Sequence, residues 1–124
     1  FTHSSKWVGA ISHTHKNTGI DIECPTEKII KVASRFTNEN ERKYFTIDKY
    51  RPELLLIWCA KESVFKMKGS AFTDFAETMQ VLPFTTADKG LFYMQLSKTD
   101  EILEVNYELN NDFALTWCVD QQTV

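Results

Sequence analysis

Two stretches in the C-terminal part of the chain alternate apolar residues with mostly polar ones, which is the period of a strand with one buried face. Every second residue is apolar, namely Leu103, Val105, Tyr107 and Leu109 in the first stretch and Phe113, Leu115, Trp117 and Val119 in the second. Residues 110–112 (Asn-Asn-Asp) between them are typical of a turn. The pattern predicts an antiparallel hairpin. Residues 75–82 and 91–96 are weaker strand candidates.

The N-terminal part predicts two more strands. Residues 6–12 read as one strand, residues 13–17 as a turn and residues 18–23 as the returning strand. Pro25 ends the second strand, because proline cannot donate a backbone hydrogen bond.

Helical spacing follows. Thr26 can cap a helix whose apolar face comprises Ile29, Val32, Ala33 and Phe36. Asn38 followed by Glu41 resembles a capping box that opens a short second helix running to Phe45.

A third, longer helix is expected between Pro52 and about Lys68. Pro52 suits a first helical position, and Gly69 suits the position after the last turn. Strands, then helices, then an antiparallel meander predict an α+β fold, with an antiparallel sheet and helices packed on one face. We expect a single domain over residues 1–124.

Composition limits the function classes. A net charge of -3 and a pI near 5.6 argue against a generic nucleic-acid binder. The most apolar run, residues 54–60, is too short to span a membrane. Three cysteines without CxxC spacing favour reduced thiols and a cytoplasmic location. The sequence begins with Phe1 and shows no signal peptide, so we expect it to be a piece of a longer or processed chain.

Two acids in the second strand are candidates for metal binding. Side chains alternate along a strand, so Asp21 and Glu23 share one face, while Ile20 and Ile22 share the other. Two carboxylates on one face repel each other unless something positive lies between them. The alternative is that both acids lie on the solvated face of a half-buried strand, which is common.

A third acid lies in the long predicted helix. Glu62 falls on a stripe with Trp58 and Phe65, where a carboxylate is costly unless it is paired or bound to a metal. Lys66 follows one turn later. Three converging carboxylates with a lysine suit a Mg²⁺ site that acts on phosphates. The alternative is an ordinary solvated Glu62–Lys66 pair at i,i+4 spacing.

The N-terminal residues Thr2 and His3 form a polar stretch with two serines just before the first predicted strand. Hydroxyls and an imidazole can hold a phosphate through O–H and N–H donors. The alternative is a polar turn at the chain end.

Three segments together resemble the 4′-phosphopantetheinyl transferase superfamily, in its surfactin-synthetase-activating type. They are Thr-His-Ser-Ser at residues 2–5, Gly-Ile-Asp-Ile-Glu at residues 19–23 and Trp-Cys-Ala-Lys-Glu-Ser-Val-Phe-Lys at residues 58–66. The resemblance implies Mg²⁺-dependent transfer of 4′-phosphopantetheine from coenzyme A to a serine of an acyl or peptidyl carrier protein. Adenosine 3′,5′-bisphosphate is the product released.

The resemblance also implies residue roles. Asp21, Glu23 and Glu62 would hold Mg²⁺, and Glu62 would also serve as a base for the incoming serine, directly or through water. Lys66 would neutralise charge on the leaving phosphate.

For coenzyme A, the resemblance implies contacts from Thr2, His3, Lys61 and Lys66. Thr2 replaces the usual serine of the first segment, which keeps the hydroxyl, and Cys59 replaces the usual Ser or Thr of the third.

This type of enzyme has two similar halves, and the chain resembles the C-terminal half. We therefore expect self-association or a missing N-terminal half, with no nucleic acid or membrane as partner. The alternative function is a non-catalytic binding or assembly module that retains the fold.

Overall fold

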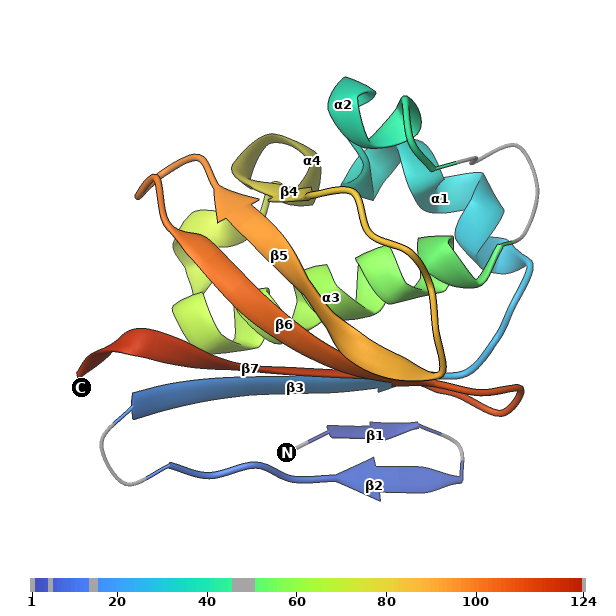
Figure 1. The fold of residues 1–124 in the computed structure, drawn as a ribbon, viewed down its shortest axis with the longest axis horizontal. Helices are drawn as coiled ribbons and strands as arrows, with labels where there is room; N and C mark the ends of the chain where they lie inside the picture. The colour runs from blue at the N-terminus through green and yellow to red at the C-terminus, as the bar shows by residue number, and fades with distance from the viewer. Residues whose placement is uncertain (1, 5, 14–15, 46–50, 124) are drawn as a thin grey trace.

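The structure, a computed structural model, describes residues 2–4, 6–13, 16–45 and 51–123. Its main sheet is antiparallel, with strands in the order β3-β7-β6-β5-β4 (Figure 1). The strands are β3 (Lys16–Glu23), β4 (Met79–Val81), β5 (Lys89–Leu96), β6 (Ile102–Leu109) and β7 (Ala114–Thr123). The predicted hairpin is confirmed as β6 and β7, and its turn is closed by Asn110 Oδ1, which accepts from the backbone N–H of Asp112 and Phe113.

One face of this sheet carries the helices α1 (Lys28–Phe36), α2 (Glu39–Arg42), α3 (Pro52–Lys68) and α4 (Phe75–Thr78), with a 3₁₀ turn at Ser70–Phe72. The long helix α3 packs across β3, β7 and β6, and α1 packs on α3. The predicted α+β class is thus confirmed. Among the described residues, no helix combines the length and the apolar character that crossing a bilayer demands.

Local signals placed the helix ends well. The Asn38–Glu41 capping box is present in both directions, since each side chain accepts from the other residue's backbone N–H. Pro52 occupies the first turn of α3, and Gly69 follows its last turn with φ of 94°. Positive φ favours glycine because it has no Cβ to clash.

Other helix boundaries differ from expectation. The first helix starts at Lys28 after Glu27, although Thr26 Oγ1 does accept from the Lys28 N–H. The second helix ends at Arg42, before the predicted end at Phe45, and continues as turn.

The weak strand candidate at residues 75–82 is only partly right. Its first half is α4, because the Asp74 side chain accepts from the Glu77 N–H and caps a helical turn. Only Met79–Val81 forms a strand, β4, at the sheet edge. The other candidate, residues 91–96, lies within β5 as expected.

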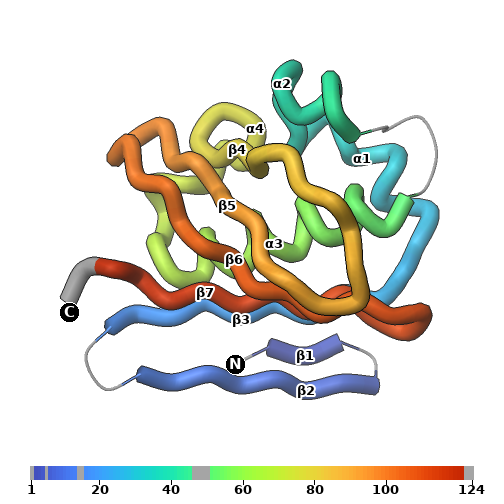
Figure 2. Tube along the Cα trace, in the orientation of Figure 1, coloured from blue at the N-terminus to red at the C-terminus, as the bar shows by residue number. Residues whose placement is uncertain are grey.

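The N-terminal residues form a two-stranded ribbon, β1 (Thr2–Ser4) with β2 (Trp7–Gly9), beside the edge strand β3 (Figure 2). The predicted strand at residues 6–12 is therefore shorter than expected. His3, expected in a turn before the first strand, lies within β1. Of the predicted turn at residues 13–17, residues 14 and 15 lie outside the described residues, and Lys16 already belongs to β3.

Candidate functional site

Strand β3 and helix α3 bring the predicted acids to one place. Alternation along β3 turns Gly19 and Asp21 towards α3, while Ile20 contacts Gly9 of the ribbon on the other side. Asp21 is 4% exposed. The predicted facing of the strand is correct, and Asp21 does not lie on a solvated face.

Gly19 sets the distance between strand and helix. A Cβ at this position would lie 1.9 Å from the carbonyl oxygen of Ser63 in α3. Only glycine allows the two backbones to approach this closely. The hydroxyl of the same residue, Ser63, lies 2.6 Å from that of Thr116 in β7, which fixes the helix to the sheet.

Lys66 is the positive partner of this site. Its Nζ donates to Asp21 Oδ1 at 2.8 Å, to Thr2 Oγ1 at 3.1 Å and to the carbonyl of Ile20 at 3.1 Å. The Thr2 hydroxyl also lies 3.4 Å from Asp21 Oδ1. Lys66 keeps about a third of its side chain exposed, so it can still meet a ligand.

The second oxygen of Asp21 is unusual. Asp21 Oδ2 is buried and has no hydrogen-bond donor among the described residues. A buried acceptor without a partner costs free energy. The nearby Glu23 carboxyl is also an acceptor, and it can bond to Asp21 only when one of the two carries a proton.

Glu23 is half-buried at the end of β3. Burial and the charge of Asp21, together with a shared hydrogen bond to Asp21, raise the pKa of Glu23 to about 7. The charge of Glu62 adds to this rise, and the Trp58 indole, which donates to Glu23 Oε1 at 3.3 Å, opposes it. The carboxylates therefore repel one another in the absence of a cation.

Glu62 extends the cluster from the helix side. Burial, followed by the charge of Asp21, raises the pKa of Glu62 above its usual value, and Lys66 opposes that rise. Glu62 is half-buried. The charges of Asp21 and Glu62 thus both act on Glu23, and the charge of Asp21 acts on Glu62.

The fit to a divalent cation has one favourable and one unfavourable feature. The orphaned Asp21 oxygen and the mutual repulsion of three acids are what a Mg²⁺ ion would relieve. Within the residues that the structure describes, however, no three acid, histidine or cysteine side chains already stand at metal-binding spacing. The half-buried Glu23 and Glu62 would have to rotate towards Asp21 to complete such a site.

The two N-terminal candidates separate. Thr2 is buried against Lys66 and Asp21, so it joins the cluster. His3, the next residue in β1, is exposed. Strand alternation explains the difference, because neighbouring side chains leave opposite faces.

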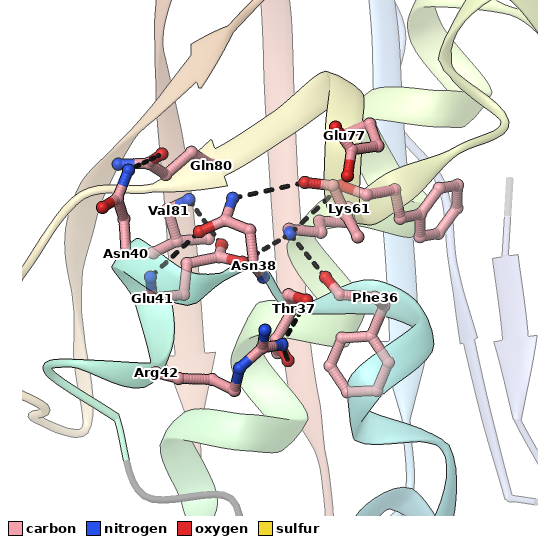
Figure 3. Close-up of polar contacts among 12 residues, drawn as sticks. Phe36, Thr37, Asn38, Asn40, Glu41, Arg42, Lys61, Glu77, Gln80 and Val81 are labelled. Atoms are coloured by element: carbon pink, nitrogen blue, oxygen red, sulfur yellow. Dashed lines mark hydrogen bonds and ion pairs between the residues drawn. The ribbon is translucent and has the colours of Figure 1, made fainter.

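The expected contact of Lys61 with coenzyme A does not agree with its position. Its side chain is fully buried, and Nζ donates to Glu41 Oε1 at 2.8 Å and to the carbonyls of Phe36 and Phe75 (Figure 3). All three N–H groups of the ammonium are used. Lys61 is therefore part of the core, and we omit it from the proposed ligand contacts.

Sequence reasoning missed Glu41 as the partner of Lys61. Glu41 is 1% exposed, and besides Lys61 it accepts from the backbone N–H of Asn38 and Val81. The capping-box spacing identified its local role. Its contacts with α3 and β4 arise from tertiary packing, which local spacing does not reveal.

A pocket of about 480 Å³ lies beside Trp58. It is lined by Val32, Arg35, Phe36, Trp58, Thr73, Asp74 and Phe75. Trp58 thus both lines this pocket and donates its indole N–H to Glu23. This geometry links a mostly apolar hollow to a charged site.

Carboxylates and a lysine thus meet between the edge strand β3 and the buried helix α3 of an α+β fold. The sequence matches the 4′-phosphopantetheinyl transferase superfamily over residues 17–118. This span includes Asp21, Glu23, Glu62 and Lys66. The chain belongs to that superfamily, as the motifs at residues 19–23 and 58–66 indicated.

A further similarity is limited in extent. Over 77 residues the chain is 34% identical to Condensin complex subunit 3 of Homo sapiens, which covers 62% of this chain and 7% of that protein. The chain thus spans a small part of the curated relative that it matches. The similarity carries no argument about the acidic cluster.

Proposed function

We propose that the chain transfers 4′-phosphopantetheine from coenzyme A to a serine of an acyl or peptidyl carrier protein in the cytoplasm, releasing adenosine 3′,5′-bisphosphate. The single observation that supports this most is the cluster of Asp21, Glu23, Glu62 and Lys66 within a chain of the matching superfamily. Phosphate transfer depends mainly on positioning and charge neutralisation, which this cluster supplies.

Asp21, Glu23 and Glu62 are the proposed holders of Mg²⁺. Asp21 would use the oxygen that has no donor, which leaves its other oxygen with Lys66. A Mg²⁺ ion held there neutralises negative charge on the pyrophosphate of coenzyme A.

Lys66 and Glu62 are the proposed catalytic residues. Lys66 carries a half-exposed ammonium that would stabilise charge on the phosphate as it leaves. Glu62 would accept the proton of the incoming serine, directly or through water. Its raised pKa makes it a better base near neutral pH than an ordinary glutamate.

Thr2 and His3 are the proposed contacts for coenzyme A phosphates. Thr2 already lies beside Lys66, and a phosphate oxygen at this point could accept from both. His3 is exposed one residue away, at the open side of the ribbon.

Helix α1 offers a surface for the carrier protein. Lys28, Lys31 and Arg35 are all exposed on this helix, which directly follows the strand that carries Asp21. An acidic patch on the partner would be attracted to these charges and would bring its serine near the cluster.

The chain is proposed to act as the C-terminal half of a two-half enzyme, completed by a second copy or by an N-terminal half. Support comes from large apolar side chains that are exposed on the ribbon and on β5 and β6, namely Trp7, Val8, Leu91, Tyr93 and Ile102. Exposed apolar surface of this kind favours association.

The test is transfer itself. The protein is incubated with coenzyme A, MgCl₂ and an apo carrier protein, and the carrier is analysed by mass spectrometry for the phosphopantetheine adduct. The adduct is expected with the wild-type protein and absent with chelator or with Asp21→Asn. Glu104→Gln, which removes an exposed acid of β6, is the matched control.

The same experiment addresses the alternative of a non-catalytic module. A protein that binds coenzyme A and Mg²⁺ but produces no adduct, even when mixed with an N-terminal half of the family, would support the binding module. It would contradict the proposed transferase.

A further inference from the structure

Lys61 was expected to contact coenzyme A, yet it is fully buried in the core, one residue before Glu62. A lysine is rarely buried unless its charge is paired. Its partner Glu41 is also buried, and the ion pair is only 2.8 Å long. Burial lowers the pKa of Lys61, and the charge of Glu41 opposes that decrease. A buried ion pair often adds little stability, because removing both charges from water costs about as much as their attraction returns. The role of Lys61 is therefore sought in its other contacts.

The other two contacts of Lys61 are backbone carbonyls from separate elements. Phe36 is the last residue of α1, and its carbonyl has no partner further along that helix. Phe75 is the first residue of α4, and its carbonyl lies 3.2 Å from Nζ. Figure 3 shows the lysine amine reaching between these elements. Lys61 thereby holds the backbone at one point in α1 and one point in α4.

The rings of these same two residues hold Trp58. The Phe36 ring meets the indole edge-on at 5.2 Å between centroids, and the Phe75 ring lies tilted at 5.6 Å. Aromatic pairs at these separations restrict each other's orientation. The indole N–H then donates to Glu23 Oε1 at 3.3 Å. A continuous set of contacts therefore runs from Lys61 to Glu23.

We propose that Lys61 and Trp58 are positioning residues for Glu23: Lys61 holds the backbone of Phe36 and Phe75, their rings orient the Trp58 indole, and the indole N–H orients the carboxylate. The inference rests on the proposed function only for the identity of the ion that Glu23 meets. Residues that orient a ligand in this way typically change metal affinity 10–100-fold when they are altered.

The test uses the indole N–H resonance of Trp58 in metal-free protein, read by two-dimensional NMR. Trp58→Phe assigns that resonance by its disappearance, and it removes the donor while keeping an aromatic ring. Lys61→Met combined with Glu41→Gln removes both buried charges together, so that no unpaired charge remains in the core. Lys68→Met is the matched control, because Lys68 is another ion-paired lysine of α3 but pairs with Glu101 and Asp120.

The double variant is expected to shift the Trp58 resonance and to lower the Mg²⁺ affinity, measured by calorimetry with MgCl₂, about tenfold. Adding Trp58→Phe to it should cause little further loss, because contacts in series are not additive. Lys68→Met should leave both readouts as in the wild type. Additive losses, or a changed melting temperature with the resonance and the Mg²⁺ affinity unchanged, would overturn the proposal.

Should the double variant fail to fold, Phe75→Leu carries the test, since it removes one ring that holds the indole and leaves the Lys61 contact in place. An unshifted Trp58 resonance in that variant would contradict the inference. The outcome is separate from that of the proposed function. If the wild type transfers phosphopantetheine but the Trp58 resonance of the variant does not shift, the proposed function stands and this inference fails. If the resonance shifts but the wild type shows no transfer, this inference stands and the proposed function fails.

Discussion

Replacing Glu23 by glutamine should make the metal-free protein more stable at alkaline pH. The same change should greatly weaken Mg²⁺ binding. Burial and the charge of Asp21 raise the pKa of Glu23 to about 7 in the folded chain, against 4.5 ordinarily. The unfolded chain therefore loses this proton first as pH rises. Stability from this group is fully present below pH 4.5 and is lost as pH rises through about 7.

The difference between these pKa values corresponds to about 3 kcal/mol at ~1.36 kcal/mol per pKa unit. Glu23 is only half-buried, and solvent screening reduces the effect to about 1–2 kcal/mol. Wild type and Glu23→Gln should have similar free energies of unfolding at pH 5, where Glu23 is neutral. At pH 8 the variant should be the more stable by that amount.

Urea unfolding followed by tryptophan fluorescence at pH 5, 6, 7 and 8 measures this difference. Glu104→Gln, an exposed acid of β6, controls for the loss of one negative charge. A Glu23→Gln variant that is less stable than the wild type at pH 8 would refute the reasoning, since Glu23 would then stabilise the free chain. So would a difference that does not change with pH.

Mg²⁺ should make the wild type more stable than Glu23→Gln at pH 8, which reverses the order expected without metal. A cation that binds the folded chain at 100 times its Kd adds about 2.7 kcal/mol. The wild type should gain this stability chiefly above pH 7, where Glu23 is charged, and the variant should gain little. Equal gains for both proteins would show that Glu23 is not a ligand.

The remaining predictions concern turnover, packing and assembly. Lys66→Ala should reduce the transfer rate about 10²-fold or more. It should cost about 1–3 kcal/mol of unfolding free energy, because Lys66 is partly exposed but its partner Asp21 is buried; equal losses of both would make Lys66 structural. Asp21→Ala should abolish Mg²⁺-dependent transfer, and full activity would sink the mechanism. Gly19→Ala should lower the melting temperature and the transfer rate together, because the added methyl meets the Ser63 carbonyl and overpacking costs about 1–3 kcal/mol or more; calorimetry checks this, and an unchanged melting temperature would contradict the close approach. Light scattering should show self-association of the isolated chain, and a stable monomer that binds coenzyme A tightly would show that the half-enzyme proposal is wrong.

Features set by neighbouring residues were predictable from the sequence. The capping box at Asn38 and Glu41, the helix start at Pro52 and the stop at Gly69 all depend on contacts within one turn. The hairpin of β6 and β7 was equally readable from its alternation and its turn. The facing of β7 was not, because Thr116 and Cys118 contact α3 and are buried, whereas Leu115, Trp117 and Val119 are only half-buried. The facing of Asp21 follows from the same period.

Features set by tertiary packing were not predictable. The apolar stripe drawn through Trp58 understated how deeply α3 is buried, since the helix is covered on most sides and encloses even Lys61. An i,i+4 pattern reports neighbours on one helix, and it carries no information about a partner such as Glu41 on another.

The acidic cluster and the core behind it have opposite energetics. Asp21 has a buried oxygen without a donor, and Glu23 and Glu62 both have raised pKa values, so this site is destabilised in the free chain. Behind it, Ser63 and Thr116 tie α3 to the sheet. Lys61 with Glu41 ties it to α1, α2, α4 and β4. Strained groups persist only where their surroundings over-determine them. The dense network around α3 is what holds three mutually repelling carboxylates together, as the proposed cation site requires.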